Sequence, residues 1–239
     1  MKTVLKRVSA CLFVLILVLL SGCGEDVTYQ LNEDGTCRIT VSAENAANYE
    51  WVPGFSVEGV AEITGSDVAS SGLDFTGYSS SYWCEFRGVS QGTTDVLLNY
   101  RQIYEGGSYS SITRLYELQV DADGRIFACT QYADTLGNGG NLYAYLKCNP
   151  GEGYNWNAVS WDEEILSVNR TGSEEDTDQR FPGNVWQVFH FAQKAEGDSV
   201  VVFELTDGDG NVTHTVAYLL HIVSGVTPTC VLIPPSQAQ

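Results

Sequence analysis

The chain has 239 residues, and its 30 acidic residues against 12 lysines and arginines give a formal net charge of −18 at pH 7. Such an acidic surface disfavours charge-driven binding to nucleic acid or anionic lipid headgroups, so we expect no nucleic-acid partner. Hydrophobic residues make up 44% of the chain and charged residues 18%, which excludes an intrinsically disordered protein.

The first 22 residues have the pattern of a bacterial signal peptide. Three basic residues precede an uninterrupted apolar run at residues 11–20, which is short for a membrane span but typical of a signal-peptide core. The run ends in Leu-Ser-Gly-Cys at residues 20–23, which resembles a lipobox. This resemblance implies cleavage before Cys23, acylation of its thiol and a lipid-anchored, extracytoplasmic protein of the cell envelope. Ordinary secretion with a chance cysteine is the alternative.

The remainder of the chain is typical of β-strands joined by turns. Residues 36–42 and 114–120 alternate apolar and polar side chains as half-buried strands do. Residues 142–146 and 200–203 are further strand candidates, and residues 162–168 are the best candidate for one or two helical turns. We therefore predict an all-β fold.

Landmark residues recur about 105 positions apart, which indicates an internal duplication. The matching pairs are Tyr49 and Tyr154, Trp51 and Trp156, Trp83 and Trp186, and Gly92 and Gly197. Each half has about seven short strands, as expected of an immunoglobulin-like β-sandwich. The predicted organisation is a signal peptide at 1–22, β-sandwich domains at 23–121 and 122–224, and an extended, mobile tail at 225–239.

An odd number of cysteines follows Cys23, and the expected compartment permits disulfides. They are Cys37, Cys84, Cys129, Cys148 and Cys230. Disulfides between neighbouring strands and buried free thiols remain equally open as interpretations.

Residues 149–156, with the sequence Asn-Pro-Gly-Glu-Gly-Tyr-Asn-Trp, resemble the first motif of the chagasin family of papain-like cysteine protease inhibitors. The resemblance covers residues 121–223. It implies an immunoglobulin-like sandwich in which three loops at one end enter the protease cleft and block it without covalent chemistry. A papain-like cysteine protease is thus the expected partner.

The resemblance assigns the binding residues to three loops of the second half. They are Asn149, Pro150, Gly151, Glu152 and Gly153; Pro182, Gly183 and Asn184; and Asp207, Gly208, Asp209 and Gly210. Proline and glycine stiffen and narrow the first loop, and Tyr154 and Trp156 are expected in the core. The third loop lacks the aromatic residue of the family motif, so a non-inhibitory immunoglobulin-like interaction or adhesion module is the alternative. In the first half, residues 44–48 and 100–105 are degenerate counterparts of the first and third loops.

No catalytic residue, cofactor or metal is expected. Residues 88–92 fit the GxSxG pattern around Ser90, but they lie between predicted strands rather than on a strand–turn–helix elbow. Residues 207–211 resemble the start of a calcium loop, but Val212 and Tyr218 replace the required glycine and glutamate, so a hairpin turn is the better interpretation. The acidic residues at 174–178 are expected to form a solvated loop. Histidines on predicted strands are expected to be structural.

Overall fold

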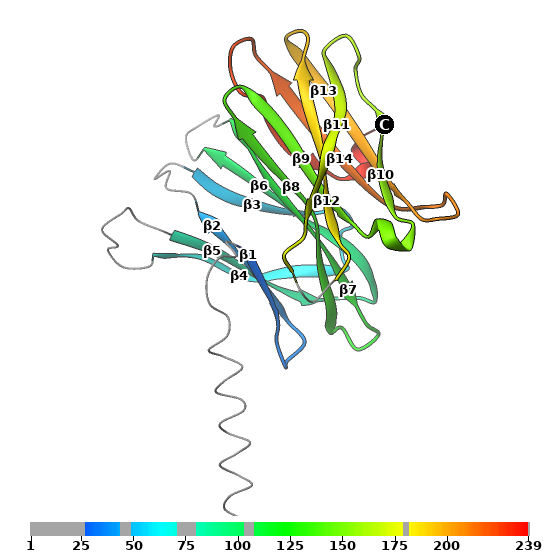
Figure 1. Ribbon diagram of the computed structural model, residues 1–239. Helices are drawn as coiled ribbons and strands as arrows, with labels where there is room; N and C mark the ends of the chain where they lie inside the picture. The colour runs from blue at the N-terminus through cyan, green and yellow to red at the C-terminus, as the bar shows by residue number, and fades with distance from the viewer. Residues whose placement is uncertain (1–26, 44–48, 71–79, 103–107, 179–181, 239) are drawn as a thin grey trace, which may run out of the picture.

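The computed structural model describes residues 27–43, 49–70, 80–102, 108–178 and 182–238, and within them it is an all-β protein with antiparallel sheets (Figure 1). The predicted signal peptide, Cys23 and residues 44–48 lie outside the described residues, as do residues 103–107 of the degenerate third loop. The elements are β1 (Val27–Leu31), β2 (Cys37–Ala43), β3 (Tyr49–Phe55), β4 (Ala61–Ser70), β5 (Ser80–Gly88), β6 (Gly92–Gln102), β7 (Tyr109–Val120), β8 (Ile126–Asn138), β9 (Asn141–Cys148), β10 (Asn155–Ser160), β11 (Leu166–Glu175), β12 (Val185–Gln193), β13 (Gly197–Thr206), β14 (Val212–Ile222) and β15 (Thr229–Ile233), with the short 3₁₀ turns η1 (Pro150–Glu152) and η2 (Pro235–Gln237).

The strands form three sheets. The first has the order β1-β2-β5-β4, the second runs β11-β12-β9-β8-β7-β6-β3, and the third has the order β10-β13-β14-β15. The seven-stranded second sheet spans both halves of the chain because β7 and β8 pair as a hairpin at its centre. In the turn between them, Asp121 Oδ1 accepts the backbone N–H groups of Asp123 and Arg125 at 2.9 Å.

The strand order of the first half recurs seven strands later in the chain. The order β1-β2-β5-β4 becomes β8-β9-β12-β11, and the order β3-β6-β7 becomes β10-β13-β14. The tryptophan and glycine pairs of the sequence fall on strands that correspond in this way; Trp83 on β5 and Trp186 on β12 are one example. Tyr49 begins β3, and its counterpart Tyr154 directly precedes β10. Recurrence in sequence and recurrence in strand order thus have the same period.

Strand β6 is buried on both faces, because both halves of the chain pack against it. Every residue from Thr94 to Tyr100 is buried. Val96 and Leu98 point into one core with Phe86 of the first sheet, whereas Leu97 points into the other core with Phe203 of the third sheet. The three apolar residues at the centre of the strand, Val96 to Leu98, are what burial on both faces favours.

Residues 225–238 hold a strand that is packed into the fold, which corrects the prediction of a mobile tail for this part of residues 225–239. They contain β15, which pairs with β14 and lies against β7. Cys230 and Leu232 are buried in the second core. The side chain of Asn99 on β6 accepts the N–H of Leu232 at 2.7 Å and donates to its C=O at 3.1 Å. A buried amide therefore pairs the backbone of an edge strand that would otherwise be open.

The helical turn expected at residues 162–168 is confined to its start. The N–H groups of Ile165 and Leu166 donate to the carbonyl of Asp162, which makes a single turn. Leu166 is fully buried and begins β11, so from this residue the chain continues as a strand with its side chain in the core.

The five cysteines after Cys23 are buried free thiols, which decides between the two interpretations of the sequence. Burial raises the pKa of Cys84 and of Cys148 to about 11 and that of Cys230 to about 12. Because the thiolate is the reactive form, these side chains are expected to be chemically inert in the folded protein.

Replacing Asn99 with alanine should destabilise the protein. The N–H and C=O of Leu232 would lose their partners in a buried site, which should lower the free energy of unfolding by at least about 2 kcal/mol. Urea unfolding measures this. The exposed Asn157, whose amide donates to Thr206 at 3.3 Å, is the matched control, and its alanine variant should stay within about 0.5 kcal/mol. Equal effects of the two variants would contradict the role given to Asn99.

The buried thiols should resist modification until the protein unfolds. At pH 8 the raised pKa of Cys84 and Cys148 leaves about 100-fold less thiolate than an ordinary cysteine has, and burial slows access further. Labelling with a thiol reagent followed by peptide mass spectrometry distinguishes the individual cysteines. Rapid labelling of these two residues in the native protein, at the rate seen in guanidinium, would show that the cores are not closed as described.

Candidate functional site

The three loops that the sequence assigned to binding lie side by side at one end of the second half. The first loop joins β9 to β10, the second joins β11 to β12, and the third joins β13 to β14. A Cβ atom on Gly153 would lie 2.9 Å from Cα of Gly208, so the first and third loops touch. A Cβ atom on Gly183 would lie 3.3 Å from Oδ1 of Asn149, so the second loop touches the first.

The first loop is a short, internally hydrogen-bonded turn. Asn149 is extended, as expected before proline, and its Oδ1 accepts the N–H of Gly151 at 3.1 Å. Gly153 has a φ of +87°, a left-handed conformation that favours glycine, and it donates to the carbonyl of Pro150. Pro150, Gly151 and Glu152 are exposed, so the tip of the turn faces solvent.

The third loop is a tight hairpin turn, as predicted. Asp207 Oδ1 accepts the N–H groups of Asp209 at 3.0 Å and of Asn211 at 2.9 Å. Hydrogen bonds from the side chain and backbone of Asn211 lower the pKa of the Asp207 carboxyl. Because Asp207 satisfies its own turn, the outward part of the loop consists of the exposed Gly208, Asp209 and Gly210.

The second loop contributes Pro182 and Gly183, both exposed, and the half-buried Asn184. Its base is fixed by a buried ion pair, with Nζ of Lys147 at 2.8 Å from Oδ2 of Asp176 and side chains only 8% and 5% exposed. The same Nζ lies 4.6 Å from the ring centroid of Trp186. The sequence interpretation of a solvated acidic loop is therefore wrong for Asp176, whose partner lies 29 positions away on β9 and could not be identified from local pattern.

Trp156 on β10 is buried next to the first loop, in agreement with the expectation that it belongs to the core. It is 1% exposed, its Nε1 donates to the carbonyl of Lys147 at 2.9 Å, and its N–H donates to Gln187. Tyr154 packs partly buried against the same core. The surface of the three-loop end is thus formed by glycine, proline and short polar side chains.

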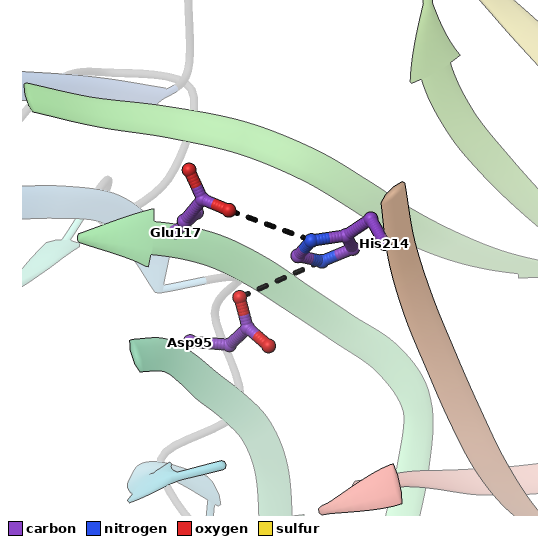
Figure 2. Close-up of side chains that lie close together, drawn as sticks. All are labelled: Asp95, Glu117 and His214. Atoms are coloured by element: carbon purple, nitrogen blue, oxygen red, sulfur yellow. Dashed lines mark ion pairs between the residues drawn. The ribbon is translucent and has the colours of Figure 1, made fainter. Parts of the chain in front are cut away.

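A second cluster of chemically active side chains lies where the two halves meet (Figure 2). Asp95 on β6 and Glu117 on β7 face the imidazole of His214 on β14. Nε2 of His214 is 3.5 Å from Asp95 Oδ1, and Nδ1 is 3.5 Å from Glu117 Oε2. The ring stacks on Tyr132, with centroids 4.4 Å apart, and meets the edge of Trp156 at 6.0 Å.

The two carboxyl groups of this cluster have opposite pKa shifts. Burial raises the pKa of Asp95, and the charge of His214 offsets only part of that effect. Burial acts on Glu117 in the same sense, but hydrogen bonds from His214 and Gln119 hold its pKa below the usual value. The negative charge of Glu117 is therefore better stabilised by its hydrogen-bond partners than the negative charge of Asp95 is.

Sequence reasoning missed this cluster. Its members belong to two different halves of the chain, and only the packing of β14 over β6 and β7 brings them together. One local signal was present, since Asp95 and Glu117 are each a carboxylate inside a strand of otherwise mostly apolar or uncharged side chains. A charged residue in such a run needs a buried partner.

Ser90, His190 and His221, which the sequence interpretation considered and set aside, each have a hydrogen-bond or ion-pair partner. Ser90 donates to the carbonyl of Gly59 at 2.7 Å. Nε2 of His190 lies 3.0 Å from Asn141. His221 forms an exposed pair with Asp198, with Nδ1 at 2.6 Å from Oδ1.

Comparison of the chain with protein-family models, curated proteins and solved structures gives no match. The resemblance to the chagasin family therefore remains a prediction from the residues of the first loop. Among the described residues there is no helix of the length and apolarity needed to cross a membrane.

Replacing Lys147 with methionine should destabilise the base of the second loop strongly. An unpaired buried carboxylate at Asp176 should cost about 3–5 kcal/mol in the free energy of unfolding. The double variant Lys147→Met with Asp176→Leu removes both charges and should recover most of that loss. Urea unfolding of the two single variants and the double variant gives the coupling; purely additive losses would contradict the ion pair.

Proposed function

We propose that this protein binds a papain-like cysteine protease and inhibits it by inserting the three-loop end into the active-site cleft. The adjacency of the three loops carries the proposal: Gly153 touches Gly208, and Gly183 touches Asn149. Segments that are distant in sequence thus form one exposed, continuous end of the molecule. A protein acting in this way works by binding rather than by catalysis.

The fold we infer is a tandem pair of immunoglobulin-like sandwiches. In such a sandwich four strands in the order A-B-E-D face three strands in the order C-F-G. Both halves follow this order, with β1-β2-β5-β4 facing β3-β6-β7 and β8-β9-β12-β11 facing β10-β13-β14. The B–C, D–E and F–G loops share one end of such a sandwich, which accounts for the meeting of the three loops.

The stiffness of the first loop supports insertion into a narrow cleft. The chain there is fixed by Pro150, by the side chain of Asn149 and by the left-handed Gly153, so little conformational entropy is lost on docking. The exposed Glu152 and Asp209 make the end acidic, which favours a target with a basic rim around its cleft. Through Cys23, the lipid anchor we propose would hold this end outside the cytoplasm.

A non-inhibitory interaction or adhesion module is the second candidate. It is favoured by the third loop, where Gly208, Asp209 and Gly210 stand in place of the aromatic residue expected of the chagasin motif. Tight interfaces usually depend on a central aromatic or arginine anchor. Without one, the same end could recognise a partner with no cleft to fill.

Peptide hydrolysis by a papain-like protease, followed with the purified protein at micromolar concentration, distinguishes the two candidates. We expect the wild-type protein to suppress hydrolysis and Gly151→Trp to lose that effect, because a bulky side chain at the exposed tip of the first loop prevents entry into the cleft. Gly172→Trp on β11 is the matched control, since a Cβ atom there meets nothing within 4 Å. It should inhibit as the wild type does.

Two outcomes would overturn the proposal. Unchanged hydrolysis in the presence of the wild-type protein would remove the inhibitory function and leave the interaction module. Equal inhibition by the wild type and Gly151→Trp, with both folded by circular dichroism, would show that the three-loop end is not the contact.

A further inference from the structure

The carboxylates of Asp95 and Glu117 are placed where their charges repel. The two residues are register partners on β6 and β7, so their side chains emerge side by side from one face of the sheet. Their side chains are only 11% and 13% exposed. Like charges directly opposite each other destabilise a sheet, and burial strengthens the repulsion. A cation between them is needed if both are to remain ionised.

His214 meets the two carboxylates in different ways. Glu117 accepts a hydrogen bond from the imidazole, through the contact at Nδ1, and another from Gln119 at 2.8 Å. Asp95 Oδ1 and His214 Nε2 face each other at 3.5 Å, yet neither atom has a hydrogen-bond partner among the described residues. This asymmetry places the imidazole proton on Nδ1 and leaves the lone pair of Nε2 directed at Asp95.

This arrangement matches the surroundings of a metal-binding histidine. Two ligands on a tetrahedral ion with bonds of about 2.0–2.2 Å are separated by about 3.3–3.6 Å, close to the Nε2–Oδ1 distance seen here. Metal-binding histidines commonly donate their other N–H to a carboxylate, which fixes the tautomer and the ring orientation. Glu117 occupies that position, and Tyr132 holds the ring from its face.

The charge balance also favours a divalent ion over a proton. Among the described residues, the charged groups that act on Asp95 are His214 and Glu117. An imidazolium between two carboxylates leaves one buried negative charge uncompensated. A divalent cation beside a neutral imidazole compensates both carboxylates.

The cluster is reached from solvent through a shallow groove of about 420 Å³. Asp95 and His214 are both part of its lining, together with Ser56, Thr213 and Thr215. Oδ1 of Asp95 and Nε2 of His214 are themselves buried, so oxygen ligands that complete the coordination of an ion would enter from this groove.

The geometry points to a binding site for a divalent first-row metal ion of the zinc class, held by Nε2 of His214 and Oδ1 of Asp95. Glu117 is the positioning residue, acting through Nδ1 of the histidine. The ion links β6 of the first half to β14 of the second. The sequence interpretation expected no metal, and the two ligands lie 119 positions apart in the chain.

Zinc titration of the metal-free protein tests this site. Nuclear magnetic resonance of the three imidazoles, with isothermal calorimetry for affinity, should show one ion bound and the signals of His214 shifted. Glu117→Gln should weaken binding by about 10–100-fold, since it removes the orienting carboxylate. Asp95→Asn, which keeps the shape of the side chain, should weaken it further, and His214→Gln should abolish it.

His221→Gln is the matched control, because His221 and Asp198 form a histidine–aspartate pair like that of His214 and Asp95, but on the exposed surface. It should bind zinc as the wild type does. The proposal is overturned if zinc leaves the His214 signals unchanged, or if binding is lost in His221→Gln rather than in Asp95→Asn. Unchanged affinity in Glu117→Gln would overturn the positioning role. The wild-type titration decides the main claim even if a variant fails to fold.

Discussion

The structure depends on one constraint: β6 and β7 are covered on both faces. The first sheet packs on one face, and the third sheet, through β15, packs on the other. Apolar side chains on both sides, such as Val96 and Leu97, are removed from water only when both halves of the chain are in place. The two halves are therefore two parts of one structure in which a continuous sheet is shared.

Polar groups in this central layer need partners from the other half, because they are largely buried. Asn99 pairs with the backbone of Leu232, and the carboxylates of Asp95 and Glu117 meet His214. In each case the strand from the second half closes the site. The loops that we propose as the binding end lie next to this layer, since His214 follows the third loop and its ring meets Trp156 beneath the first loop. Their own geometry depends on local turns and on the Lys147–Asp176 pair.

Much of the fold class followed from the sequence, and the long-range pairs did not. Alternation located β2 and β7, and recurring tryptophans and glycines predicted the period that the strand order also shows. The conformation of the first loop was predictable because Pro150 and Gly153 restrict or require particular backbone angles. Asp176, Asp95 and the strand at 229–233 were misjudged or missed, because their roles are set by residues brought close only by tertiary packing.

Hydrogen–deuterium exchange on a mixture of the protein and a papain-like protease tests most directly whether the three-loop end is the binding surface. We expect slower exchange confined to the backbone of residues 149–153, 182–184 and 207–211 when the protease is present. Protection that appears on the edge strand β11 or in the first half, with these three segments unchanged, would contradict it.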